Sequence, residues 1–108
     1  MNILIFGFTF KENCPDVRNT KVIDIYNSLK SYNVNITVYD PWANPNVAKH
    51  EYGIEILNEL PTEKYNAAII AVAHKNFEDI DVISMLNENH VVFDVKWTLD
   101  KTLVDGRL

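Results

Sequence analysis

The sequence predicts an α/β protein: a Rossmann-like three-layer sandwich built on a parallel sheet of about five strands, with residues 1–108 forming one domain. Two observations support this. Short apolar or β-branched segments alternate along the chain with segments whose apolar residues recur at helical spacing. Residues 67–73 form a continuous apolar run, which is typical of a central parallel strand buried on both faces. Such alternation favours right-handed crossovers with helices on both faces of the sheet.

The strands are expected at residues 3–6, 34–39, 54–57, 67–73 and 91–95. The second of these alternates and is β-branched, and it should end before Pro41, which cannot continue a strand ladder.

Three helices are expected between the strands. The first begins at a cap, Asn19 or Thr20, and fades near residues 32–33. A short exposed helix covers residues 44–52 and ends at Gly53, and a third covers residues 77–86. The tail, residues 98–108, shows no clear pattern.

The composition excludes several classes of function. A net charge of −5 argues against general nucleic-acid binding, which needs a basic surface. No apolar run approaches the roughly 20 residues of a membrane span. The single cysteine, Cys14, cannot form an internal disulfide, and we expect a cytoplasmic protein. No His/Cys cluster has metal-ligand spacing, so no metal site is predicted.

The polar turn after the first strand carries two cations, Lys11 and Arg18, with Asp16 between them. The carboxyl ends of parallel strands are where such sheets bind ligands, and Lys and Arg both suit phosphate or carboxylate groups. An equally weighted alternative is that Arg18 pairs with Asp16 while Lys11 is solvated. Cys14 in the same turn has no neighbouring base and is not expected to be a nucleophile.

Two further polar residues end predicted strands. His74 follows residues 67–73 and could act as a general base or contact a ligand, but a packed or capping role is favoured. His50 and His90 are expected at the surface. Asp40 occupies the position that holds the ribose in dinucleotide-binding folds, yet Asp-Pro is itself a turn initiator, and the turn is favoured.

The first strand is followed by residues 7–12, in which bulky phenylalanines replace the G-x-G-x-x-G fingerprint. This sheet is therefore not expected to bind NAD in the standard way. A response-regulator receiver has a similar alternation of elements, but it needs an acidic pair after the first strand to hold Mg²⁺, and that pair is absent.

Four motifs together resemble one family. They are the segments at residues 7–11, 16–20, 38–41 and 105–107, which read GFTFK, DVRNT, VYDP and DGR. Across essentially the whole chain they are similar to the C-terminal domain of the UDP-glucose/GDP-mannose dehydrogenases, nearest the branch that oxidises UDP-N-acetylhexosamines for surface polysaccharides.

The resemblance implies an oxidation of the sugar C6 alcohol to a carboxylate with two NAD⁺ and a catalytic cysteine. It implies that Phe10, Lys11 and Arg107 bind the UDP-sugar. It also implies that Arg18 reaches toward NAD on another domain, with Asp16 supporting that loop.

The family's catalytic cysteine and NAD fingerprint lie in segments before this domain, and Cys14 is not that cysteine. We therefore expect an excised domain that is inactive alone and that belongs with N-terminal and middle domains, in a homodimer or larger assembly. The alternative is a stand-alone Rossmann-like module that binds a nucleotide or a protein partner. Trp42, Trp97 and Phe77 are expected to form an apolar patch above the usual few hundred Å².

Overall fold

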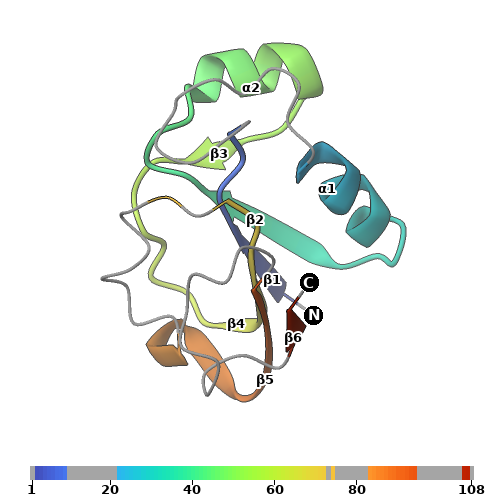
Figure 1. Ribbon diagram of the computed structural model, residues 1–108, viewed down its shortest axis with the longest axis vertical. Coiled ribbons are helices and arrows are strands. Elements are labelled where there is room, and N and C mark those ends of the chain that lie inside the picture. The colour runs from blue at the N-terminus through green and yellow to red at the C-terminus, as the bar shows by residue number, and fades with distance from the viewer. Residues whose placement is uncertain (1, 10–21, 73, 75–82, 95–105, 108) are drawn as a thin grey trace.

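The computed structural model describes residues 2–9, 22–72, 74, 83–94 and 106–107 (Figure 1). The strands are β1 (Asn2–Phe6), β2 (Asn35–Tyr39), β3 (Ile56–Leu57), β4 (Tyr65–Ile70), β5 (Leu86–Asp94) and β6 (Gly106–Arg107). The helices are α1 (Val22–Lys30), α2 (Pro45–Tyr52) and a short 3₁₀ helix, η2 (Ile83–Met85).

The strands form one parallel sheet in the order β3-β2-β1-β4-β5-β6, which confirms the predicted Rossmann-like parallel sheet. β1 is central and pairs with β2 on one side and with β4 on the other. The sixth strand, β6, is only two residues long and falls in the tail that the sequence pattern left unassigned. Because all pairs are parallel, every carboxyl end lies at the same edge of the sheet.

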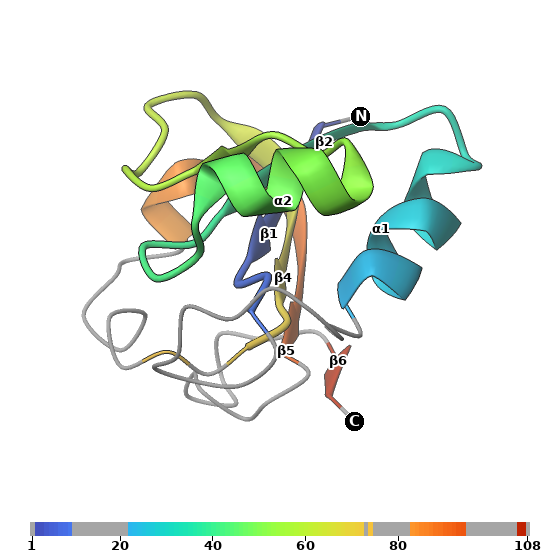
Figure 2. The ribbon, with the colours of Figure 1, turned by 90° about the horizontal axis from the view of Figure 1, so that it is seen from above.

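The two α-helices pack on the face of the sheet that carries Ile3 and Ile5. Val22 of α1 and Ala48 of α2 join these residues in one buried cluster. α1 lies beside β2, and α2 lies beside β3 (Figure 1). Figure 2 shows the start of β1 and the end of β6 at opposite edges of the molecule.

The opposite face of the sheet carries a second buried cluster that includes Leu4, Phe6, Ile70 and Val92. The helix expected to cover it was placed at residues 77–86. Residues 75–82 lie outside the described part, so the second helical layer is not among the described elements.

The predicted end of that helix is wrong. Leu86 is the first residue of β5, and it follows the 3₁₀ turn η2. Leu86 pairs with Tyr65 of β4, and both side chains are buried in the same cluster. The pairing then jumps to Ala67 and Val91, so β5 is longer than predicted and contains an irregularity.

The predicted bounds of α2 are confirmed within a residue at each end. Asn44 is its N-cap, and its side-chain oxygen accepts from the backbone N–H groups of Asn46 and Val47 at 3.0 and 3.3 Å. Gly53 ends the helix with φ +69°, a left-handed conformation that glycine adopts without steric cost. No helix in the described part of the chain is long and apolar enough to cross a membrane.

Candidate functional site at the carboxyl edge of the sheet

The chain leaves β1 through a tight contact at Gly7. This residue has φ +97°, and a Cβ added to it would lie 2.6 Å from the Val72 Cβ. Ala71 and Val72 follow β4, and their N–H groups donate to the carbonyl oxygen of Phe6 at 2.9 and 3.4 Å. The segments after β1 and β4 are therefore in direct contact where they leave the sheet, which only glycine at position 7 allows.

Asp40, the residue after β2, holds two segments together with one side chain. Its carboxylate is fully buried. Oδ2 accepts from the backbone N–H groups of Phe8 and Thr9 at 2.6 and 3.2 Å. Oδ1 accepts from those of Trp42 and Ala43 at 2.7 and 3.1 Å. The turn predicted at Asp40 is thus confirmed, and the same carboxylate also fixes the segment that follows β1.

His74, which follows β4, adds a third segment to this arrangement. Its Nε2 lies 2.9 Å from Asp40 Oδ2 and 3.0 Å from Thr9 Oγ1. Because a carboxylate can only accept, we assign the ring proton to Nε2, with Asp40 as its acceptor. His74, Asp40 and Thr9 are at most 1% exposed. The packed role predicted for His74 is confirmed.

Trp42 covers this cluster from the outside. Its indole stacks on the His74 imidazole with ring centroids 6.1 Å apart and an interplanar angle of 29°. The Trp42 side chain remains 39% exposed. It therefore places an aromatic surface at the carboxyl edge, beside the histidine that follows β4.

Asn58 completes the hydrogen bonding of Asp40. Its Nδ2 donates to the carbonyl oxygens of Asp40 and Ala43 at 2.8 and 2.9 Å, and the Asp40 N–H donates to Leu57 O at 2.9 Å. Every polar group of Asp40 therefore has a partner within the protein.

The strand ends of such a sheet can hold a dinucleotide or a metal ion, and the contacts of Asp40 bear on both. The Asp40 carboxylate is buried and bonded to five donors, so it does not offer the ribose contact of a dinucleotide-binding fold. Among the described residues, the carboxylate at the ribose position is thus not placed for the standard contact with NAD. Among the described residues, no three His, Cys, Asp or Glu side chains are grouped so that they could hold a metal ion.

Tyr39 precedes Asp40, and its phenol is affected by the same environment. Burial raises the pKa of Tyr39 above its ordinary value, and the neighbouring Asp40 charge raises it further. The phenol therefore stays neutral over a wider pH range than a free tyrosine.

All the residues predicted to bind ligand or NAD, except Arg107, follow closely after Thr9 in the sequence. Phe10, Lys11, Asp16 and Arg18 lie outside the described residues, as does Cys14. Thr9 is the last described residue before them, and its backbone and side chain are both held by the cluster.

Arg107 lies in β6 and pairs with Asp94 of β5. It is therefore at the same carboxyl edge as Thr9. Three strand spacings separate β6 from β1, or about 14 Å at a typical spacing of about 4.8 Å. The backbone thus places Arg107 and Thr9, the last described residue before Lys11, along one edge of the sheet.

Two residues of the Asp40 cluster were missed from the sequence. Thr9 and Asn58 were not singled out, because a lone threonine or asparagine near a strand end has many ordinary roles. His50 is exposed on α2, which confirms its predicted place at the surface. The side chain of His90 lies outside the part of the chain that the structure describes.

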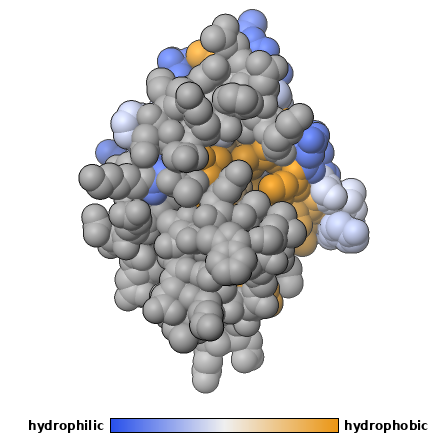
Figure 3. All heavy atoms as spheres, in the orientation of Figure 1, coloured by the Kyte–Doolittle hydropathy of each residue, from blue (hydrophilic) through white to orange (hydrophobic). Residues whose placement is uncertain are grey.

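The predicted aromatic patch falls mostly outside the described residues, which include Trp42 but neither Trp97 nor Phe77. Figure 3 shows apolar side chains gathered beside α1 on one face, next to grey atoms. Other large apolar side chains that are exposed are Tyr32, Val47, Leu57, Leu60 and Val91.

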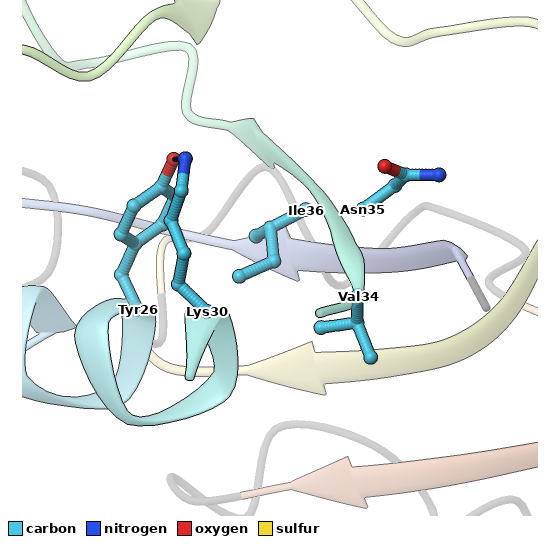
Figure 4. A pocket seen from close by; sticks show the side chains of 5 residues that line it. All are labelled: Tyr26, Lys30, Val34, Asn35 and Ile36. Atoms are coloured by element: carbon cyan, nitrogen blue, oxygen red, sulfur yellow. Dashed lines mark hydrogen bonds between the residues drawn. The ribbon is translucent and has the colours of Figure 1, made fainter. Parts of the chain in front are cut away.

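A shallow pocket of about 200 Å³ lies elsewhere, between the end of α1 and the start of β2 (Figure 4). Tyr26 and Lys30 line one side, with the Lys30 Nζ 5.5 Å from the centre of the Tyr26 ring, and Val34, Asn35 and Ile36 line the other. Because β2 begins here, the pocket is at the amino edge of the sheet and is separate from the Asp40 cluster.

Comparison with known proteins decides the family. The model of the UDP binding domain of the UDP-glucose/GDP-mannose dehydrogenase family matches residues 4–101. The chain belongs to this family. The resemblance drawn from the four sequence motifs is thereby confirmed.

Curated relatives in the family include two UDP-N-acetyl-D-glucosamine 6-dehydrogenases. The one from Pseudomonas aeruginosa is 42% identical over 109 residues, which cover 98% of this chain and 26% of the relative. The one from Salmonella typhi is 39% identical over 110 residues, covering 99% and 26%. The chain spans about a quarter of the length of these relatives. Their names confirm the predicted UDP-N-acetylhexosamine branch.

Solved structures of the family share the fold. The UDP-glucose dehydrogenase of Pyrobaculum islandicum matches with a TM-score of 0.75 at 22% identity, over 98% of this chain and 24% of that chain. The UDP-N-acetyl-mannosamine dehydrogenase Cap5O of Staphylococcus aureus matches with a TM-score of 0.72 at 19% identity, over 92% and 23%.

Proposed function

We propose that these 108 residues form the UDP-sugar-binding domain of a longer NAD-dependent dehydrogenase that oxidises the C6 alcohol of a UDP-N-acetylhexosamine to a carboxylate. The observation that carries the proposal is the family match over residues 4–101, together with about 40% identity to the two 6-dehydrogenases. The product would serve surface polysaccharide biosynthesis in the cytoplasm.

Phe10 and Lys11 bind the UDP-sugar in this proposal. The described structure supports it because Thr9, two residues before Lys11, is anchored at the carboxyl edge of the sheet. A diphosphate needs cations and N–H donors, and a lysine at the start of the loop supplies the charge. Arg107 contributes from β6 at the same edge, in its own subunit or across a subunit interface.

Arg18 contacts NAD that is held by another domain, and Asp16 supports the loop between the two cations. When bound, NAD accepts a hydride, which carries two electrons. Two molecules are needed because an alcohol loses four electrons in becoming a carboxylate. The inward-facing Asp40 supports placing NAD on a different domain, since this sheet lacks a free carboxylate at the ribose position.

The chain is not catalytic by itself in this proposal. Its natural partners are the N-terminal and middle domains of the parent protein and a second subunit in a homodimer or larger assembly. The sole cysteine, Cys14, lacks the sequence context of the family's catalytic cysteine.

An assay of NADH formation tests the proposal. The parent protein should form two NADH for each UDP-N-acetylhexosamine consumed, whereas the 108-residue chain should form none with the same substrate and NAD⁺. Turnover by the isolated chain would refute the claim that it is inactive without the other domains. A parent protein that reduces no NAD⁺ with any UDP-sugar would refute the proposed reaction.

A further inference from the structure

The geometry points to Asp40 and His74 as positioning residues for the loop that carries Lys11, a role that neither the family match nor the sequence motifs assign. The inference deepens the proposed function and rests on it for the identity of the ligand. Three segments meet at the buried Asp40 carboxylate, one from each of β1, β2 and β4.

The first step concerns where the loop starts. Phe8 and Thr9 are the last described residues before it, and both donate their backbone N–H groups to Asp40 Oδ2. Two successive N–H bonds to one oxygen fix the direction in which the chain leaves Thr9. Phe10 and Lys11 follow Thr9 in the sequence, so we expect a change of chain direction at Thr9 to displace the Lys11 charge.

The second step concerns what fixes the Asp40 oxygen itself. Oδ1 is held by the turn through Trp42 and Ala43, and Oδ2 is held by His74. His74 also reaches the Thr9 hydroxyl, so it contacts both the carboxylate and the segment that the carboxylate holds. Removing the imidazole therefore breaks two contacts, one to the Asp40 carboxylate that holds Thr9 and one to the Thr9 hydroxyl itself.

The third step connects this rigidity to affinity. A ligand that binds only the correctly placed loop has an apparent Kd equal to the intrinsic value divided by the fraction of molecules in that conformation. If losing the His74 contacts reduces that fraction to about one tenth, binding weakens about tenfold. The bound conformation itself should not change.

A catalytic role for His74 does not follow from this geometry. The ring is fully buried beneath Trp42, and its Nε2 is directed at Asp40 and Thr9. His74 thus acts on the ligand through the loop.

Three variants of the 108-residue chain separate positioning from general stability. His74→Leu removes the donor, and His74→Gln restores an N–H that can reach Asp40. Val92→Ala is the matched control, because Val92 is fully buried in the cluster on the opposite face and its truncation destabilises the fold without touching Asp40.

The first readout needs no ligand. In ¹⁵N spectra of His74→Leu, we expect amide shifts from Phe8 through residue 18 and faster hydrogen exchange at the Phe8 and Thr9 amides. His74→Gln should largely reverse both changes, and Val92→Ala should show neither. Unchanged loop amides in His74→Leu, or equal changes in Val92→Ala, would overturn the inference.

The second readout is the affinity for UDP in the same spectra. His74→Leu should bind about tenfold more weakly and reach the same shifts at saturation, while His74→Gln and Val92→Ala bind like the wild type. Loop amides that move without any loss of UDP affinity would also overturn the inference. If the wild-type chain fails to bind UDP, the proposed ligand is wrong, and the ligand-free readout still decides the positioning role.

Discussion

The close approach at Gly7 gives a prediction whose size follows from the structure. In Gly7→Ala the new Cβ meets Val72 Cβ at 2.6 Å and Val72 N at 3.0 Å. Overpacking of this kind costs about 1–3 kcal/mol, and a non-glycine residue at positive φ costs about 1–2 kcal/mol more. We expect the free energy of unfolding to fall by about 2–5 kcal/mol, a large part of the ~5–15 kcal/mol typical of a domain.

Gly53→Ala is the matched control. Gly53 also has a positive φ, +69°, but an added Cβ would meet nothing within 4 Å. It should lose only the conformational part, about 1–2 kcal/mol. Both variants gain equally from a stiffer unfolded chain, so that effect cancels in the comparison.

Urea unfolding of the two variants and the wild type measures the difference. The midpoints should shift without a change in slope, and Gly7→Ala should shift about twice as far or more, as the summed costs require. Equal losses in the two variants would refute the claim that the segments after β1 and β4 are packed without space for a side chain.

Three further changes test other parts of the fold. Asn44→Ala removes the N-cap of α2 and should cost about 1 kcal/mol in urea unfolding; a loss near zero would mean that the cap is not formed. Asn58→Ala leaves two carbonyl groups without their donor and should cost about 1–3 kcal/mol; a smaller loss would indicate that water replaces the amide. Folding raises the pKa of Tyr39, so its contribution to stability is complete below the ordinary value of 10.0 and is lost as pH rises through the folded-state pKa. The wild type should therefore lose more stability than Tyr39→Phe in alkaline melts, and parallel pH profiles would contradict this.

Much of the sheet could be predicted because short stretches of sequence mark its strands without reference to distant residues. The apolar segments that became β1 and β4 are long enough to be assigned by themselves, and Gly53 marks the end of α2 without reference to other elements. The end of β4 was predicted three residues too late, at residue 73 instead of Ile70, because Ala71 and Val72 stay buried and apolar after leaving the strand.

The start of β5 could not be predicted in the same way. Residues 87–90 are polar, so the pattern alone indicates a loop between a helix and a strand. The chain continues as a strand there because Leu86 pairs with Tyr65 and packs in the same cluster. That pairing is set by tertiary contacts and leaves no local signal.

The candidate site shows the same limit. The roles of Asp40 at a turn and of His74 as a packed residue were correctly predicted from their positions at strand ends. Their hydrogen bond to each other joins residues 34 positions apart, and their shared contact with Thr9 depends on the order of β1, β2 and β4. The binding roles of Lys11 and Arg18 remain predictions, since both lie outside the described residues.

The most direct test of the central claim is a titration of the ¹⁵N-labelled chain with UDP, compared between the wild type, Lys11→Ala and Lys49→Ala. Lys49 is the control because its side chain is 70% exposed in the last turn of α2 and forms a 3.8 Å ion pair with Glu55. We predict shifts centred on the loop from Phe10 to Arg18. Losing a charge-assisted contact worth about 1.5–3 kcal/mol should weaken UDP binding about ten- to a hundredfold in Lys11→Ala and leave Lys49→Ala unchanged. Shifts centred elsewhere, or equal affinities in the wild type and Lys11→Ala, would contradict the account.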